Sequence, residues 1–176
     1  MKIDDILYFA PKVRFDDLDF VGHELPQQFA ARINGYYLDA AEHCGHSGFA
    51  FAAGVLVLAA IDALARVQIG GAVGSRFKSF AAHELGSFSK AETAAKLYDD
   101  FRNGLIHEAR IKQGAQFSLQ SGQTIAEADG VVIVNPLLLS SEVRGALERY
   151  VRKLNREPKL LSDLRNRLMQ DHADDV

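Results

Sequence analysis

The stretch GFAFAAGVLVLAAI, residues 48–61, is the longest apolar stretch of the chain without a charged side chain, and Asp62 ends it. Its fourteen residues are fewer than the roughly 20 that a membrane-spanning helix needs. We therefore expect a helix over 48–67 that is buried on most of its circumference, and no membrane partner. The alanines and Gly54 allow neighbouring helices to approach closely, so this segment predicts a core of packed helices.

Apolar residues recur at helical spacing on both sides of this segment. The spacing predicts further helices over 25–43, 75–85, 89–111, 140–154 and 159–170. The expected N-caps are Ser75, Ser87 or Ser89, and Ser140 or Ser141. Pro26 suits a first helical turn, and Pro158 separates the last two helices.

The period changes after Gly114. Residues 116–119 and 131–134 are strand-like, and a third short strand is allowed over 124–126. The pattern does not fix the structure of the acidic, partly aromatic residues 3–20. We expect a mainly α fold: a helical bundle with a small antiparallel β-hairpin or meander inserted at about 115–135, all within one domain over residues 1–176.

Composition is ordinary for a soluble globular protein of 176 residues, with 48% hydrophobic and 24% charged residues. Cys44 is the only cysteine, which excludes an intrachain disulfide and suits a reducing cytoplasm. The N-terminus carries acids where a signal peptide has basic residues, so we expect no export signal and a cytoplasmic protein.

Charge is unevenly distributed around a net value of −3. Residues 1–62 carry four basic and nine acidic side chains, whereas residues 142–167 carry eight basic and four acidic ones. The basic segment could help to hold a polyanion. We favour the plainer interpretation, a solvated amphipathic helix.

The stretch LYDDFRNGLIHEARIKQG, residues 97–114, concentrates the polar chemistry of the chain. On a helical projection, Asn103 and His107 lie opposite a core stripe, and Arg102 lies on the flank. The stripe consists of Ala94, Leu97, Tyr98, Phe101 and Leu105. Ile106 beside the polar residues, and a glycine in the helix at position 104, suggest that a second protomer or another helix covers this face.

Arginine with histidine suits a phosphate ester, because guanidinium donates two hydrogen bonds to phosphoryl oxygens and imidazole transfers protons near neutrality. Spacing alone leaves the alternative that these residues only face water. Asp99 could position Arg102 or Asn103, or be an ordinary surface charge. Glu108 falls among the core positions, where it would need a basic partner or a route past the stripe.

Other histidines are weaker candidates. His43, Cys44 and His46 lie close together at the end of a predicted helix and could bind a transition metal. A fourth ligand is not evident, so we favour histidines that interact with the helix dipole. No carboxylate–histidine cluster has ligand-like spacing, and we expect neither a metal nor another cofactor.

The six residues Arg102-Asn103-Gly104-Leu105-Ile106-His107 match the Arg-x4–6-His motif of the HEPN superfamily of helical bundles. The chain resembles that family over roughly residues 25–170, in the late position of the motif on a long helix; the β insertion departs from the minimal bundle. The resemblance implies a metal-independent endoribonuclease whose composite site forms across a symmetric homodimer.

Carried onto this chain, the resemblance makes His107 the general base or acid, Arg102 the group that stabilises phosphoryl charge, and Asn103 a positioning residue. It implies RNA with 2′,3′-cyclic phosphate ends as product, and a role as a toxin with an antitoxin partner, in phage defence or in RNA processing. A non-catalytic HEPN-like dimer that binds RNA or a protein partner is the alternative. A small-molecule enzyme with a site between helices is a third class.

Overall fold

The computed structural model describes residues 2–108 and 110–173, apart from the side chains of Ile106 and His107. The chain forms two compact units, one from residues 1–36 and 147–176 and the other from residues 37–146. Helix α7, Pro136–Leu154, begins in the second unit and ends in the first. The predicted fold class, mainly α with a small β insertion, is confirmed. The single domain over residues 1–176 stays a prediction.

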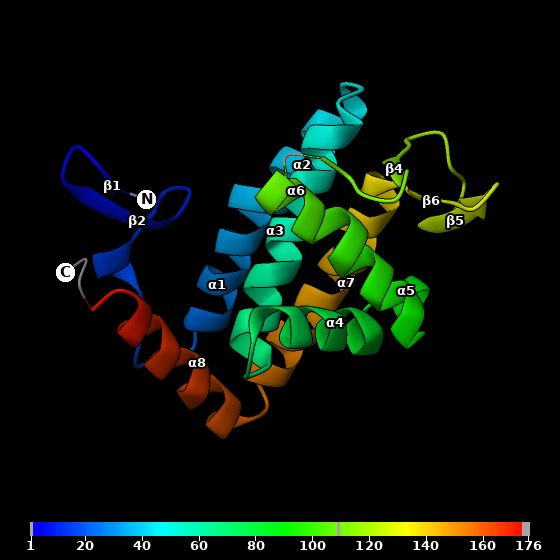
Figure 1. Cartoon of the computed structure of the whole chain (residues 1–176). Helices are drawn as coiled ribbons and strands as arrows, with labels where there is room; N and C mark the ends of the chain where they lie inside the picture. Colours follow the sequence, from blue (N-terminus) through cyan, green and yellow to red (C-terminus); the bar gives the residue numbers. More distant parts are fainter. Residues whose placement is uncertain (1, 109, 174–176) are drawn as a thin grey trace. The chain divides into compact units, whose positions relative to one another are not determined.

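The first unit contains a small sheet that the sequence pattern did not reveal. Strands β1 (Lys2–Ile3), β2 (Ile6–Ala10) and β3 (Val13–Arg14) pair antiparallel in that order (Figure 1). The two turns use positive φ angles at Asp4, Asp5 and Lys12 instead of at glycine. The glycine-containing dipeptides that usually mark a two-residue hairpin are therefore missing.

Helices complete this unit around an aromatic core. They are η1 (Phe15–Asp17), α1 (Leu25–Ile33), the C-terminal part of α7 and α8 (Pro158–Asp171). Phe29 meets Tyr150 edge-on, with ring centroids 6.0 Å apart. Arg32 ties α1 to the sheet, because its Nη1 donates to the Phe9 carbonyl at 2.6 Å and its guanidinium lies 4.8 Å from the centre of the Phe9 ring.

The second unit is built on α3, Ala50–Gln68, which packs against α2 (Asp39–His46) and α4 (Val73–Glu84). A π-helical segment, η2 (Asn34–Leu38), leads into α2. Figure 1 shows α4 crossing near the end of α3, and α6 (Asn103–Glu108) beside α3. Two further short helical pieces, η3 (Gly86–Phe88) and α5 (Ala91–Lys96), connect α4 to the motif.

Helix α3 confirms the predicted helix but is less enclosed than expected. Ala53, Val57, Ile61 and Leu64 are fully buried, and an added Cβ at Gly54 would lie 2.2 Å from the Phe117 ring. Less than half of the helix is buried, so its opposite apolar face remains accessible. Of the described helices, α3 alone is long and apolar enough to cross a membrane, a test that a core helix of a soluble protein also passes.

The inserted sheet contains the predicted hairpin and one strand of unexpected direction. Strands β5 (Ile125–Ala128) and β6 (Val131–Val134) pair antiparallel around a tight turn at Asp129-Gly130, where both φ angles are positive. Strand β4 (Gln116–Phe117) joins the other edge of β6 in parallel. Parallel pairing needs a longer connection, and residues 118–130, which include β5, supply it.

The predicted serine caps are wrong. Helix α4 starts at Val73, before Ser75, and Lys90 is the N-cap of α5. Helix α7 starts at Pro136, and the Asn135 side-chain oxygen accepts hydrogen bonds from the Leu137 and Leu138 amides. Asn135-Pro136 thus ends the sheet and caps the helix, whereas Ser140 is buried in its second turn.

Candidate functional site

The predicted motif helix consists of three segments. Helix α5 passes into the π-helical turn η4 (Leu97–Arg102), where the Asn103 amide donates to the Tyr98 carbonyl, and then into α6. The core stripe is confirmed at Ala94, Leu97 and Phe101, which are buried, whereas its other two members, Tyr98 and Leu105, are half-buried. Single π turns inside α-helices are frequent at functional sites. Here the turn ends on Arg102.

Gly104 is packed against the chain itself. After Glu108 the backbone returns along the helix, and the Lys112 amide donates to the Asp100 carbonyl at 2.8 Å. An added Cβ at Gly104 would lie 2.4 Å from the Arg110 carbonyl oxygen. From the sequence we expected another helix or a second protomer to cover this glycine, but the backbone of residues 110–112 explains it.

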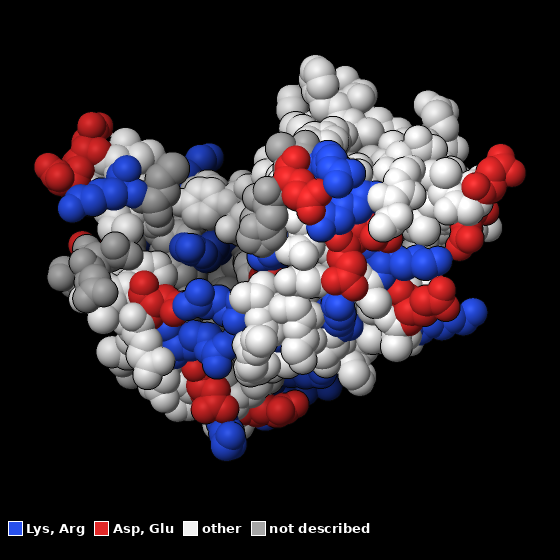
Figure 2. Space-filling view, viewed as in Figure 1, with Lys and Arg blue, Asp and Glu red and all other residues white. Residues whose placement is uncertain are grey.

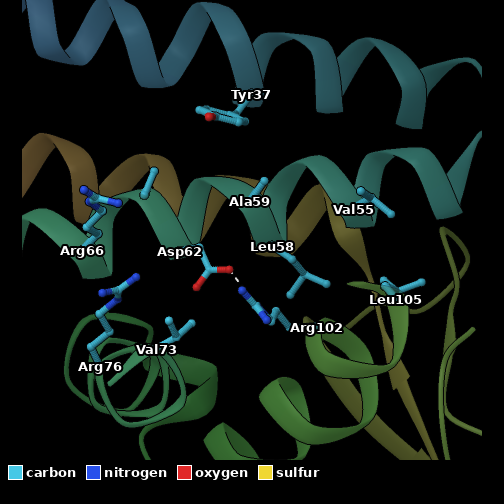
Figure 3. Close-up of a pocket in the computed structure, with 11 residues that line it drawn as sticks. Tyr37, Val55, Leu58, Ala59, Asp62, Arg66, Val73, Arg76, Arg102 and Leu105 are labelled. Atoms are coloured by element: carbon cyan, nitrogen blue, oxygen red, sulfur yellow. Dashed lines mark hydrogen bonds and ion pairs between the residues drawn. The ribbon is translucent and has the colours of Figure 1, made fainter. Parts of the chain in front are cut away.

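Arg102 binds a carboxylate that the sequence analysis did not assign to it. Its Nε donates to Asp62 Oδ2 on α3 at 2.7 Å, and its guanidinium lies 5.6 Å from the centre of the Tyr98 ring. Both partners of the ion pair are mostly withdrawn from solvent, with side-chain exposures of 15% for Arg102 and 22% for Asp62. The pair fixes the guanidinium against α3 (Figure 3).

The neighbouring acids have other partners. Asp99 pairs with Lys78 at 2.8 Å, which supports its interpretation as a surface charge. Glu108 is exposed and pairs with Lys112 and Arg110, so it does not enter the core stripe. The Lys112 hydrogen bond lowers the pKa of Glu108.

Of the three predicted site residues, the structure places the side chains of Arg102 and Asn103. Arg102 is placed by its ion pair, and Asn103 is half-buried at the start of α6. The backbone of His107 belongs to α6, but its side chain lies outside the described residues, as does that of Ile106. A shared site for Arg102, Asn103 and His107 therefore stays a prediction.

Arg102 lines a pocket of about 340 Å³ in the second unit. Figure 3 shows its lining: one face of α3, the start of α4, Tyr37 above and Leu105 at one end. The walls are mainly apolar, and the charged members are Asp62, Arg66, Arg76 and Arg102. Ligand pockets in proteins commonly have this volume and this mixture of apolar walls with a few polar groups.

Two polar atoms at this pocket are buried without a hydrogen-bond partner among the described residues. They are Asp62 Oδ1 and Arg76 Nε. Such atoms cost roughly 1–3 kcal/mol each when no partner satisfies them. The pocket thus combines three guanidinium groups and one carboxylate with one unsatisfied acceptor and one unsatisfied donor.

Sequence reasoning missed Asp62, Arg66, Arg76 and Tyr37 as members of one site. A signal for Asp62 was present, because a carboxylate on a largely buried helix needs a partner. Arg66 follows Asp62 by one helical turn and therefore shares its face. Arg76 and Tyr37 come from other elements, and no spacing within the sequence joins them to α3.

The histidines of α2 and the basic segment 142–167 were the other candidates for a functional site. His43 and His46 lie in the last turn of α2, as the dipole interpretation expects. No group of three or more His, Cys, Asp or Glu side chains is placed to hold a metal ion within the described part of the chain. In the basic segment 142–167, Arg144 pairs with Asp39 and Glu42 of α2, which neutralises part of its charge.

Comparisons with protein-family models, with curated proteins and with solved structures find no match for this chain.

Proposed function

We propose that the chain is a HEPN-like protein that acts on RNA as a metal-independent endoribonuclease, with a composite site across a homodimer. The observation that carries the proposal is the placement of Arg102: the π turn and Asp62 hold its guanidinium at a cationic pocket. Guanidinium groups are suited to phosphate oxygens. An arginine preorganised in this way can stabilise charge on a phosphoryl group without reorganising.

In the proposed reaction, His107 takes the proton of a ribose 2′-hydroxyl as that oxygen attacks the adjacent phosphorus. The bond from phosphorus to the 5′-oxygen of the next nucleotide breaks, and protonation of this oxygen yields a 5′-hydroxyl end. The other product ends in a 2′,3′-cyclic phosphate. Arg102 stabilises the additional negative charge, and Asn103 orients the phosphate or the imidazole.

The homodimer is supported by exposed aromatic side chains near the start of α3. Phe49 is 64% exposed and Phe51 is 52% exposed, and both border a second hollow that Ile111 and Phe117 also line. Figure 2 shows no Lys, Arg, Asp or Glu on the viewed face at this end of the unit. Exposed apolar surface of this kind favours protein association.

The cellular setting follows from the proposed activity. An RNA-cleaving protein of this type would act in the cytoplasm as a toxin, in phage defence or in RNA processing. A cognate antitoxin protein is the expected partner in the first case.

Cleavage of labelled RNA in the presence of EDTA tests the proposal. The wild type should cleave, and His107→Ala should lose about two or more orders of magnitude in rate, the range for a general acid–base residue. His46→Ala is the matched control, because His46 is an exposed helix-end histidine in the same unit. Equal rates for wild type and His107→Ala, or loss of activity with EDTA, would overturn the mechanism.

The alternative function, a non-catalytic HEPN-like dimer, predicts a different pair of results. The wild type would bind labelled RNA, or a protein partner, without shortening the RNA. Substituting Arg102 would weaken RNA binding, whereas His107→Ala would leave the RNA intact as in the wild type. The half-buried Asp62–Arg102 pair also suits this alternative, because it needs only a placed guanidinium.

A further inference from the structure

The pocket beside Arg102 carries a second arginine that the proposed RNA cleavage does not use. Arg76 lines the pocket from α4, and its Nε is buried without a hydrogen-bond partner among the described residues. Figure 3 shows the Arg76 side chain rising from α4 toward the side of α3 that carries Asp62. Arg66 also lines the pocket, but it interacts with another residue of the chain. Arg76 is therefore the arginine of this pocket that needs an acceptor.

Asp62 supplies the opposite charge at the same pocket. Its Oδ2 accepts from Arg102 Nε at 2.7 Å, whereas its Oδ1 has no partner among the described residues. An ionised carboxylate offers about four lone-pair sites, so Asp62 has the capacity to accept further hydrogen bonds. The side chain of Asp62 keeps an exposure of 22%, which gives a donor group access to the carboxylate.

The two charged side chains together specify a ligand that carries both signs of charge. Arg76 Nε and Asp62 Oδ1 both lack a partner, so these two atoms do not satisfy each other. Arginine binds a carboxylate through two parallel hydrogen bonds. The Asp62 carboxylate repels a dianion more strongly than a monoanion, and it attracts an ammonium group. A zwitterion with one carboxylate and one ammonium therefore matches Arg76 and Asp62 at the same time.

The rest of the cavity is apolar and small. Val55, Leu58, Ala59 and Leu105 line it, and the Tyr37 ring lies above them (Figure 3). Its volume of about 340 Å³ is at the lower end of the roughly 300–1,000 Å³ that ligand pockets have, so the cavity suits a small molecule. Aromatic rings attract each other in offset or edge-to-face contacts beyond the burial of their area. An aromatic side chain on the zwitterion is therefore the best complement to these walls.

We propose that this pocket binds a free aromatic α-amino acid. The ligand carboxylate lies at Arg76, its ammonium group lies at Asp62, and its ring packs along Leu58 beneath Tyr37. An α-amino acid carries both charged groups on neighbouring atoms, which suits two side chains that reach the same end of the cavity (Figure 3). The inference goes beyond the proposed cleavage, because it uses neither His107 nor RNA.

Calorimetric titration of the full wild-type chain with L-phenylalanine and three analogues tests the site without any substitution. L-Phenylalanine should bind saturably. 3-Phenylpropionate lacks the ammonium group, phenethylamine lacks the carboxylate, and glycine lacks the ring. Each analogue should bind about tenfold or more weakly, as expected for loss of a charge-assisted hydrogen bond or of a buried ring. Absence of saturable binding by L-phenylalanine, or an equal affinity for 3-phenylpropionate, would overturn the proposal.

Substitution of Arg76 then tests where the carboxylate lies. Arg76→Gln should weaken L-phenylalanine binding about tenfold or more, but it should not weaken phenethylamine binding, because phenethylamine has no carboxylate. Arg152→Gln is the matched control: it removes the same charge from an exposed arginine that does not line the pocket, and should leave both affinities unchanged. Equal weakening of L-phenylalanine binding by the two variants, each with the circular dichroism spectrum of the wild type, would overturn the proposal.

Discussion

Gly104 carries the closest steric constraint of the motif helix, since an added Cβ would lie 2.4 Å from the Arg110 carbonyl oxygen. Alanine is otherwise the better helix former by about 1 kcal/mol. We expect Gly104→Ala to destabilise the protein by about 1–3 kcal/mol, because the returning backbone must shift. Urea unfolding measures this, with Gly70→Ala as the control, since nothing lies within 4 Å of an added Cβ there. A more stable Gly104→Ala protein would contradict the packing described.

The side chain of Asp100 should make the stability of the folded protein depend on pH. Burial, and then the neighbouring Asp99 carboxylate, raise the pKa of Asp100 above its usual value. Because the folded state then holds this proton more tightly than the unfolded state, the ionised carboxylate destabilises the fold at neutral pH. The destabilisation is fully present above the raised pKa and disappears below the unfolded value.

Asp100→Asn should therefore raise the melting temperature at pH 7, with a difference that vanishes as the pH falls to about 4. Asp16→Asn makes the same change of charge at an exposed position and serves as the control. Thermal unfolding monitored by circular dichroism at several pH values gives the comparison. An equal increase in the melting temperature of Asp100→Asn at pH 7 and at pH 4 would contradict the raised pKa of Asp100.

At the level of single residues, the sequence predicted the buried positions of the motif helix better than it predicted the ion-pair partner of Arg102. The buried stripe through Leu97 and Phe101 follows from helical spacing. The partner of Arg102 does not, because Asp62 lies forty residues away on α3 and only the folded chain brings the two side chains together. Local spacing left Asp99 open as a partner of Arg102 or as an ordinary surface charge, and Asp99 is bound by Lys78.

Among the elements, the start of α7 gives a direct test of capping. Asn135 Oδ1 accepts from two amides of the first turn, and its Nδ2 donates to the Ser121 carbonyl at 2.7 Å. Asn135→Ala should cost about 1–2 kcal/mol from loss of the cap alone. Ser141→Ala, at a position that the sequence analysis considered as the cap, should change stability by less than about 0.5 kcal/mol. Chemical denaturation measures both changes. A larger loss of stability for Ser141→Ala than for Asn135→Ala would contradict a helix that starts after Asn135.

The sequence predicted the long buried helices, but it did not predict the short strands or the direction of their pairing. Long apolar periods predicted α3 and α8 within a few residues, because burial enforces helical spacing. The sheet at residues 2–14 escaped because its strands are short and its turns use Asp and Lys. The parallel pairing of β4 with β6 depends on a loop path that no local pattern encodes.

For the whole molecule, we expect self-association through the end of α3 that carries Phe49 and Phe51. Sedimentation equilibrium should show a dimer for wild type. Phe51→Lys should weaken dimerisation about tenfold or more, because a charge would enter an apolar contact. Met169→Lys introduces the same charge at an exposed apolar side chain of α8 and should not affect dimerisation. A monomeric wild type would contradict the composite site.

The proposed function requires that the Arg102–His107 motif acts chemically on RNA. The ends of the RNA fragments left after incubation with the wild-type protein in EDTA show whether it does. We expect a 2′,3′-cyclic phosphate on one fragment and a 5′-hydroxyl on the other. Fragments ending in a 3′-hydroxyl and a 5′-phosphate, or RNA that stays intact, would contradict it.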